Sequence, residues 1–468
     1  MHIPETVSRG ELKRKMGAMW ELSARKIRSL ERSAGSLAGA PVFTAGGLWT
    51  SRGWTEWTQG FQFGSALLQF EAAGDQEFLE AGRRNTLEKM AVHLTHFGVH
   101  DHGFNNVSTY GTLLRLMSDG LIPETPWERH LYELALKVSG AVQARRWTLI
   151  PSGGFIYSFN GPHSLFVDTI RSLRALAVSH QLGHVLCEEN DRRVSLLQRL
   201  VQHALATARW SVYYGEGRDS YDVPGRVAHE SIFNVTDGAY RCPSSQQGYS
   251  PFSTWTRGLA WAILGFAEQL EFIDSRGEEE LAPLGGRKEI LSALSRAVKV
   301  TSDFYIENSA ADGIPYWDTG APGLVHLGDY LNRPAEPFNA FEPVDASAAA
   351  IAAQGLLRLG SIVSRFASKK ADTRHTTRDV GRRYWDAGLT VLNTLLDEPY
   401  LSISARHQGL LLHSVYHRPN GWDYVPRGQK IPCGESSMWG DYHVREAALL
   451  VQRVADGGPY YTFFGDQP

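Results

Sequence analysis

The sequence predicts an all-α fold: a closed ring of about twelve helices, arranged as six helical hairpins. Two patterns support this. Amphipathic helical segments alternate with loops along the chain. Loops rich in Gly, Trp, Asp, His and Asn also recur before about every second helix, as expected if alternate helices begin at one end of a closed ring. Because no low-complexity linker divides residues 1–468, we expect a single domain.

Apolar residues at helical spacing define the segments in order. Helices are expected near 10–36, 58–74, 75–97, 105–119, 126–144, 165–182, 190–214, 254–274, 287–309, 345–363, 377–397 and 436–454. The stretches 215–252 and 312–344 lack this spacing and are expected to be irregular or short strands. Six polar and aromatic loops are expected to line one pocket: 54–61, 100–104, 160–163 leading to Asp168, 247–261, 343–347 and 435–442.

Composition narrows the class of protein. Hydrophobic residues make up 43% of the 468 residues, enough for a large core. A net charge of −3 offers no basic surface for nucleic acid or membranes. The polar start of the chain lacks a signal-peptide core, and no run approaches the roughly 18 apolar residues of a membrane span. Three widely spaced cysteines, Cys187, Cys242 and Cys433, form neither a disulfide framework nor a zinc site, so we expect a cytoplasmic protein.

The stretch 247–261 is the most informative part of the chain. It opens an aliphatic helix, and Ser253 can cap that helix without help from its neighbours. Capping does not require Trp255, Arg257 and Trp261 together. Tryptophan faces beside a guanidinium suit a sugar ring that carries a carboxylate, which Arg257 would clamp with paired hydrogen bonds. The stretch therefore indicates an acidic carbohydrate as ligand.

Two aspartates are candidate acid–base groups. Asp168 follows three apolar residues at the start of a helix, where a carboxylate also serves as a simple cap. Burial there would raise its pKa and keep it protonated, as a general acid requires. Asp101 is either an Asx-type cap or the second carboxyl of a pair whose members shift each other's pKa. Its neighbours His100 and His102 suggest a metal site, but adjacent side chains seldom converge on one ion, so no metal is predicted.

Other polar residues are ambiguous. His229 lies in an irregular segment, where histidines more often form ordinary hydrogen bonds than contact ligands. Most tryptophans of a Trp-rich protein belong to the core, so only those in the polar loops are candidate sugar platforms. The chain contains no P-loop, no GxGxxG after a strand, no GxSxG and no HExxH. Nucleotide cofactors and serine or zinc hydrolysis lose support, and no cofactor is predicted.

A series of motifs in shared order and spacing runs from about Trp54 to Asp441. It comprises Trp57-Thr58-Gln59-Gly60-Phe61, His100-Asp101-His102-Gly103-Phe104, Asp168-Thr169, Gln247-Gly248-Tyr249, Trp255 to Trp261, Ile314 to Asp318, Asp345 to Ala353 and Trp439-Gly440-Asp441-Tyr442. With these motifs the chain resembles glycoside hydrolase family 88, the unsaturated glucuronyl hydrolases. The unsaturated rhamnogalacturonyl hydrolases of family 105 are related.

The resemblance implies an (α/α)6 barrel and a hydrolase that needs no metal or cofactor. Its substrate would be a lyase-generated oligosaccharide ending in a 4,5-unsaturated uronic acid. The enzyme would protonate C4 and add water at C5, and the terminal sugar would leave after ring opening. Asp168 would be the acid and base, with Asp101 as the second essential carboxylate. The resemblance puts the remaining predicted contacts at His229, Gln247, Arg257, Trp261 and Trp57.

The chain also departs from the family pattern. Leu259 stands where the family often has Gln, and the segments 145–163 and 318–344 do not align clearly. The alternatives are an unsaturated rhamnogalacturonyl hydrolase, another (α/α)6 glycosidase or an epimerase. A non-catalytic sugar-binding protein is disfavoured because both aspartates are present. The leaving sugar, its sulfation and the oligomeric state remain open.

Overall fold

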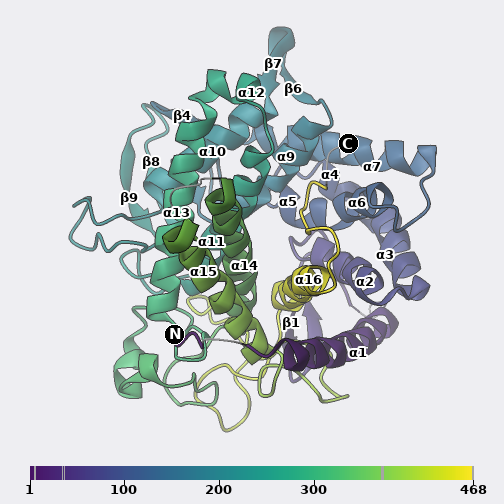
Figure 1. Cartoon of the computed structure of the whole chain (residues 1–468), viewed down its shortest axis with the longest axis vertical. Helices are drawn as coiled ribbons and strands as arrows, with labels where there is room; N and C mark the ends of the chain where they lie inside the picture. The colour runs from purple at the N-terminus through teal and green to yellow at the C-terminus, as the bar shows by residue number, and fades with distance from the viewer. Residues whose placement is uncertain (5–6, 34, 36, 370–373, 466–468) are drawn as a thin grey trace.

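A computed structural model describes residues 1–4, 7–33, 35, 37–369 and 374–465. For 367–369 and 374–379 it describes the backbone alone. Helices from successive segments contact one another and close a ring, in which α16 contacts α2 (Figure 1). The inner positions of the ring are held by α2 (Gln59–Ala73), α5 (His102–Asn105) with α6 (Thr112–Ser118), α8 (Thr169–Ser172) with α9 (Arg174–Gln181), α11 (Thr256–Asp274), α14 (Ala346–Lys369) and α16 (Met438–Ala455).

An outer layer of helices packs against this ring. It comprises α1 (Arg9–Ser33), α3 (Gln76–Lys89), α7 (Pro126–Arg145), α10 (Leu196–Trp210), α13 (Arg287–Asn308) and α15 (Arg374–Leu395). Short helices α4 (Ala91–Leu94) and α12 (Glu278–Leu281) and a π-helical turn, Val107–Gly111, complete the helical elements that position the site. Each predicted helical segment overlaps one of these helices, so the helical part of the prediction is confirmed.

Some strands lie within 215–252, where short strands or irregular structure were expected, and the others lie where helix or loop was expected, all of them in small antiparallel sheets that interrupt the helices. They are β1 (Pro41–Ala45) with β2 (Leu48–Ser51), β3 (Trp147–Ile150) with β4 (Gly153–Ile156), β6 (Val185–Glu188) with β7 (Arg192–Ser195), and the three strands β5 (Ser164–Phe166), β8 (Glu230–Phe233) and β9 (Tyr240–Ser244). The helices predicted from 165 and from 190 therefore begin too early. Strands this short carry too few residues to establish a period of two.

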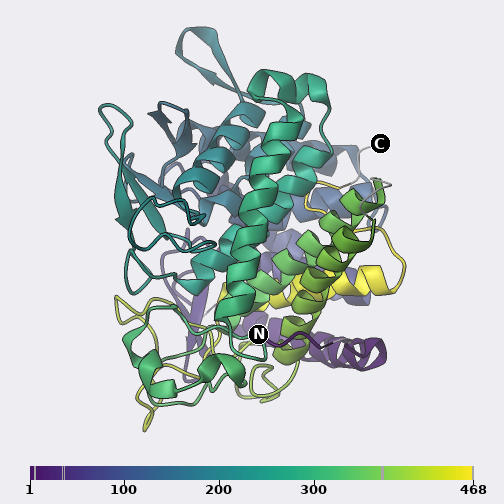
Figure 2. The ribbon, with the colours of Figure 1, turned by 60° about the vertical axis from the view of Figure 1, so that its left-hand side comes forward.

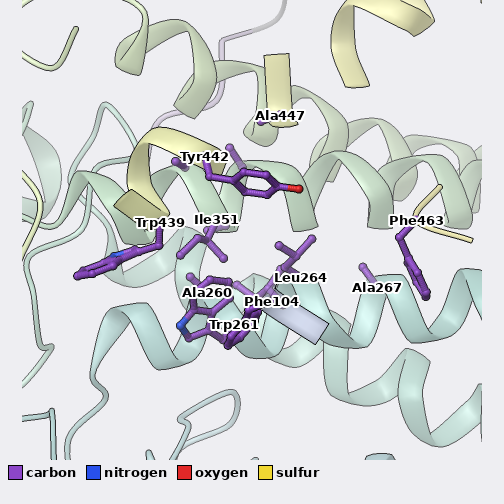
Figure 3. Packing of buried hydrophobic residues seen from close by; sticks show 14 of the residues in the cluster. Phe104, Ala260, Trp261, Leu264, Ala267, Ile351, Trp439, Tyr442, Ala447 and Phe463 are labelled. Carbon is purple, nitrogen blue, oxygen red and sulfur yellow. The ribbon is translucent and has the colours of Figure 1, made fainter. Parts of the chain in front are cut away.

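The helices α11 and α14 pack closely in the core. A Cβ atom at Gly355 would lie 2.7 Å from Cγ2 of Ile263 and 2.8 Å from the backbone nitrogen of Leu264, so only glycine permits this approach. Figure 3 shows side chains of α11, α14 and α16 meeting in the middle of the ring. Contrary to the sequence-based expectation, Ala346–Phe366 is long and apolar enough to cross a membrane, although 94% of that window is buried inside the fold, as in a core helix.

The strands and long loops gather on one side of the helices (Figure 2). Two backbone contacts connect these strands and loops with residues next to the starts of inner helices. Thr44 of β1 donates from its backbone to Ser436, just before α16. Trp255, which precedes α11, pairs in an isolated bridge with Asp318. These links hold the starts of the inner helices around a common space.

Candidate active site

A pocket of about 400 Å³ lies where the starts of the inner helices meet the loops. Its lining comes from segments far apart in the sequence, between Arg52 and Trp422. Six of the seven predicted site residues line it, and His229 lies just behind the wall. The six are Asp101, Asp168, Gln247, Arg257, Trp261 and Trp57. The structure therefore brings together the residues that the sequence analysis selected.

Asp168 follows β5 and directly precedes α8. The pairing of β5 with β8 fixes its position, since Val167 donates from its backbone to the carbonyl of His229. The Asp168 side chain forms no capping hydrogen bond with α8, and Asp101 forms none with α5. Both aspartates are nearly buried and line the pocket, so the capping interpretation fails for both.

His100 bridges the two aspartates, a role that the sequence analysis missed. Its Nε2 donates to Oδ1 of Asp168 at 3.2 Å and lies 3.6 Å from Oδ1 of Asp101. Its backbone carbonyl accepts hydrogen bonds from Gln143 and Ser172. The ring is thus held in place between the two carboxyls. The sequence showed His100 beside Asp101, but Asp168 lies 68 residues further on.

The two carboxyls have opposite pKa shifts. Burial raises the pKa of Asp101, and the nearby charge of Asp168 raises it further against the opposing effect of His100. Burial also acts to raise the pKa of Asp168, but the hydrogen bond and charge of His100, with the charge of Arg257, outweigh it and lower the pKa. The expected reason for Asp168 to be the acid, a pKa raised by burial, is therefore wrong in the ligand-free protein. The two carboxyls differ in proton affinity, and their roles as acid and base stay a prediction.

His100 itself has a raised pKa, because the charges of Asp101 and Asp168 and the hydrogen bond to Asp168 outweigh the effect of burial. Its neighbour His102 faces elsewhere, with Nδ1 near Oγ of Ser139 and Nε2 near the carbonyl of His96. Burial lowers the pKa of His102 to about 4. The two histidines do not converge, and no group of three or more potential metal ligands is found among the described residues.

Glu56 is a third carboxyl of the pocket, which the sequence analysis quoted only within a motif. Burial raises its pKa, and the charge of Asp101 adds to that effect. Its Oε1 accepts a hydrogen bond from the backbone of Trp57. The pocket is therefore rich in acidic groups, two of which have raised pKa values.

The guanidinium of Arg257 forms hydrogen bonds with other groups of the protein. Its Nη1 donates to Asp345 at 3.2 Å and to the carbonyl of Val415, and its Nη2 donates to Oε1 of Gln247 at 2.9 Å and to the carbonyl of Tyr416 at 2.8 Å. Both terminal nitrogens are engaged by the protein, and the predicted contact of Arg257 with a substrate carboxylate stays a prediction. Arg257 joins α11, the start of α14 and the loop before α16.

His229 and Gln247 are positioned as donors. Nδ1 of His229 accepts a hydrogen bond from the backbone of Gln246 at 3.0 Å, which assigns the proton to Nε2. That Nε2 is buried without a partner among the described residues. Burial lowers the pKa of His229 to about 4, so the ring is neutral. Because Oε1 of Gln247 is held by Arg257, its amide nitrogen is directed to other partners.

Aromatic rings form the walls of the pocket. Trp57 stacks on Trp439 with ring centroids 5.0 Å apart, and Trp261 lies 4.9 Å from Phe104. Trp261 is only 2% exposed, whereas Trp57 is half-buried. Trp57 is therefore the better placed of the two predicted platforms to present a ring face to a sugar.

Comparisons with known proteins agree with this architecture, although no protein-family model matches the chain. The chain is 26% identical over 413 residues to the unsaturated glucuronyl hydrolase of Bacillus sp. (strain GL1), covering 86% of this chain and 88% of the relative. It is 24% identical over 420 residues to the unsaturated chondroitin disaccharide hydrolase of Streptococcus pyogenes serotype M1, covering 87% of this chain and 83% of the relative.

Solved structures are similar over almost the whole chain. The crystal structure of the unsaturated glucuronyl hydrolase from Bacillus sp. GL1 superposes with a TM-score of 0.67 at 21% identity, covering 95% of this chain and 97% of that one. An unsaturated glucuronyl hydrolase specific for heparin superposes with a TM-score of 0.66 at 19% identity, covering 94% and 97%. The predicted (α/α)6 barrel is confirmed.

Proposed function

We propose that this chain, which is related to the unsaturated glucuronyl hydrolases by sequence and fold, is a glycoside hydrolase that releases a terminal 4,5-unsaturated uronic acid from lyase-generated oligosaccharides. The observation that carries the proposal is the pair of pocket carboxyls with opposite pKa shifts, joined by His100. Hydration of an enol ether needs one group that gives a proton and one that accepts a proton from water.

The reaction adds one water molecule across C4=C5. A carboxyl group transfers its proton to C4, and the developing positive charge at C5 is shared with the ring oxygen. Water adds at C5 and loses a proton to the second carboxylate, which restores the proton count of the pair. The hemiketal opens to a C5 ketone, and the hemiacetal left at C1 collapses to an aldehyde and the free leaving sugar.

The directions of the pKa shifts support a division of roles in the ligand-free protein. Asp101, with its raised pKa, binds a proton more tightly and would be the donor to C4, whereas Asp168, with its lowered pKa, would be the base that receives the proton of water. This reverses the order expected from the family resemblance, in which Asp168 delivers the proton. Negatively charged carboxylates near C5 also stabilise the oxocarbenium-like transition state electrostatically.

Neutral donors around the pair suit a sugar ring and a water molecule. The Nε2–H of His229 and the amide nitrogen of Gln247 each have hydrogen-bonding capacity that no partner among the described residues uses. The half-buried face of Trp57 would stack on the ring, with Trp261 behind it. These side chains would fix the substrate so that C4 and C5 face the two carboxyls.

The test is to follow the ultraviolet absorbance of unsaturated glucuronyl and rhamnogalacturonyl disaccharides side by side. The expected result is loss of the C4=C5 absorbance, faster with the glucuronyl substrate, and unaffected by chelator. A matched saturated aryl glycoside should not be cleaved. Unchanged absorbance across both substrates, with cleavage of the saturated glycoside, would reject double-bond hydration.

A further inference from the structure

An acidic substrate requires a cation, and the described lining of the pocket offers only two arginines and no lysine. Arg257 has both terminal nitrogens engaged by the protein. Arg52, the other arginine, is exposed, lines the pocket and takes part in no ion pair among the described residues. Among the described lining residues Arg52 is therefore the arginine without a salt bridge, and its charge acts on Glu56 and Tyr416 beside it.

Two aromatic rings hold the guanidinium of Arg52 at the pocket rim. Its Cζ lies 4.5 Å from the ring centroid of Trp422 and 5.4 Å from that of Tyr416. Such stacking orients a guanidinium while leaving its edge, which carries the N–H donors, available for a ligand. Trp422 is itself 44% exposed, so this rim faces solvent.

The backbone beneath Arg52 is also fixed. Its amide donates to the carbonyl of Ala40 at 3.3 Å. A Cβ atom at Gly39 would lie 2.0 Å from the carbonyl oxygen of Arg52, so the two segments touch in a way that only glycine allows. The side chain thus projects from an anchored strand end, and its position does not depend on a loose loop.

Resting on the proposed function, we propose that Arg52 is a specificity-determining residue that binds an oxyanion of the substrate at the rim of the pocket. The anion has two sources: the carboxylate of the unsaturated uronate, or an acidic substituent such as sulfate on the leaving sugar. In either case a planar guanidinium donates two parallel hydrogen bonds to the oxyanion. Such a cation also offsets the repulsion between an anionic substrate and the carboxyls of Glu56, Asp101 and Asp168.

The test compares Arg52→Gln and Arg52→Lys with wild type on three unsaturated disaccharides. One has a neutral leaving sugar, one has a sulfated leaving sugar, and one is the uronate methyl ester with a neutral leaving sugar. Arg14→Gln, an exposed arginine on α1, is the matched control. Arg52→Gln is expected to raise KM about tenfold or more with kcat changed less than about twofold, and Arg52→Lys to show a partial effect.

The substrates identify the anion. If Arg52 binds the uronate carboxylate, Arg52→Gln raises KM for the two substrates with a free uronate carboxylate and leaves KM for the methyl ester unchanged. If Arg52 binds the anion of the leaving sugar, Arg52→Gln raises KM for the sulfated substrate alone. Equal KM values for wild type and Arg52→Gln on all three substrates would overturn the inference while leaving the hydrolase activity intact.

Binding measurements separate this inference from the proposed function. Tryptophan fluorescence titrations with the same disaccharides, in wild type and Arg52→Gln, use Trp422 as a nearby reporter. Arg52-dependent binding without turnover by the wild type would reject the hydrolase and retain the anion site. Binding that does not depend on Arg52 would reject the anion site whatever the activity.

Discussion

Buried carboxylates occur in two regions of this barrel, and their partners differ. In the interior of the ring, Arg171 donates to Glu446 at 2.6 Å and to Glu268 at 3.2 Å, with all three side chains at most 1% exposed. In the pocket, Asp101 and Asp168 share a histidine and have no arginine within ion-pair distance among the described residues. Burial alone therefore does not distinguish a reactive carboxyl from a structural one.

The partners account for the different pKa values. Burial acts to raise the pKa of Glu446, but the charges of Arg171 and Arg174 outweigh it and lower the pKa strongly. Burial and the charge of Asp168 outweigh the opposing charges of His100, Arg146 and His96 at Asp101, and its pKa is raised. A carboxylate surrounded by arginines stays ionised and contributes to the fold, whereas the two pocket carboxyls, joined by one imidazole, have pKa values shifted in opposite directions.

One helix connects the two regions. Asp168 precedes α8 and Arg171 lies three residues further along, about one turn away. The ion pairs of Arg171 hold α8 from inside the ring, while β5 holds the residue before Asp168. The structural network thus positions the reactive carboxyl without changing its charge directly.

The largest effect is expected from removing a pocket carboxylate. Asp168→Asn and Asp101→Asn should each reduce kcat by about 10³-fold or more, because the reaction loses its base or its proton donor. Neither variant should lower the free energy of unfolding appreciably, since neither aspartate caps its helix or pairs with an arginine. The measurements are the loss of C4=C5 absorbance and thermal unfolding followed by circular dichroism.

Asp237→Asn, in an exposed loop, is the control and should retain full activity. If Asp168→Asn kept turnover within about tenfold of wild type, the mechanism proposed for the pair would be wrong. If it instead lost its fold, the comparison between reactive and structural carboxylates would fail at Asp168.

The opposite outcome is expected in the interior. Glu446→Gln should lower the free energy of unfolding by about 3–5 kcal/mol, because it leaves Arg171 as a buried charge with one partner fewer. The kcat per folded molecule should stay near that of wild type. Urea unfolding followed by fluorescence measures the first quantity, and absorbance assays on the folded fraction measure the second.

Glu280→Gln is the matched control, because Glu280 pairs with His180 while partly exposed and should change stability by less than about 1 kcal/mol. A Glu446→Gln variant as stable as wild type would show that the arginine network does not support the fold. A stable variant without activity would assign Glu446 to the site.

The sequence was sufficient for the long helices and for the identity of most pocket residues. Amphipathic periodicity extends over many residues in segments such as 345–363, and the polar-aromatic loops carry side chains that a helix start does not need. Hairpins of four or five residues per strand, such as β1 with β2, leave no comparable pattern. The cytoplasmic location and the contact roles of the site residues stay predictions.

The missed features depend on contacts between distant segments. The guanidinium of Arg257 is engaged by the carbonyl of Val415, 158 residues away. The pKa of Asp168 is lowered by His100, which comes from another loop. Residue types alone predicted an arginine and an aspartate at the right place, but only the fold shows which donors are already used and which charge lies closest.

The smallest effect is expected from replacing His100, which lies between the two pocket carboxyls. In His100→Gln the hydrogen bond and positive charge that lower the pKa of Asp168 are removed, so that pKa should rise. The opposing influence of His100 on Asp101 is removed as well, so its pKa should also rise. Both limbs of the bell-shaped profile of kcat/KM against pH should therefore move to higher pH.

The profile is measured with the unsaturated disaccharide over the full range in which each variant stays folded. His180→Gln is the control, because His180 pairs with Glu280 outside the pocket, and its profile should match that of wild type. A loss of activity at every pH with unmoved limbs would mean that His100 only holds the loop in place. A shift of both limbs would show that a shared imidazole, in contrast to the arginines of the interior, sets the proton affinities on which the reaction depends.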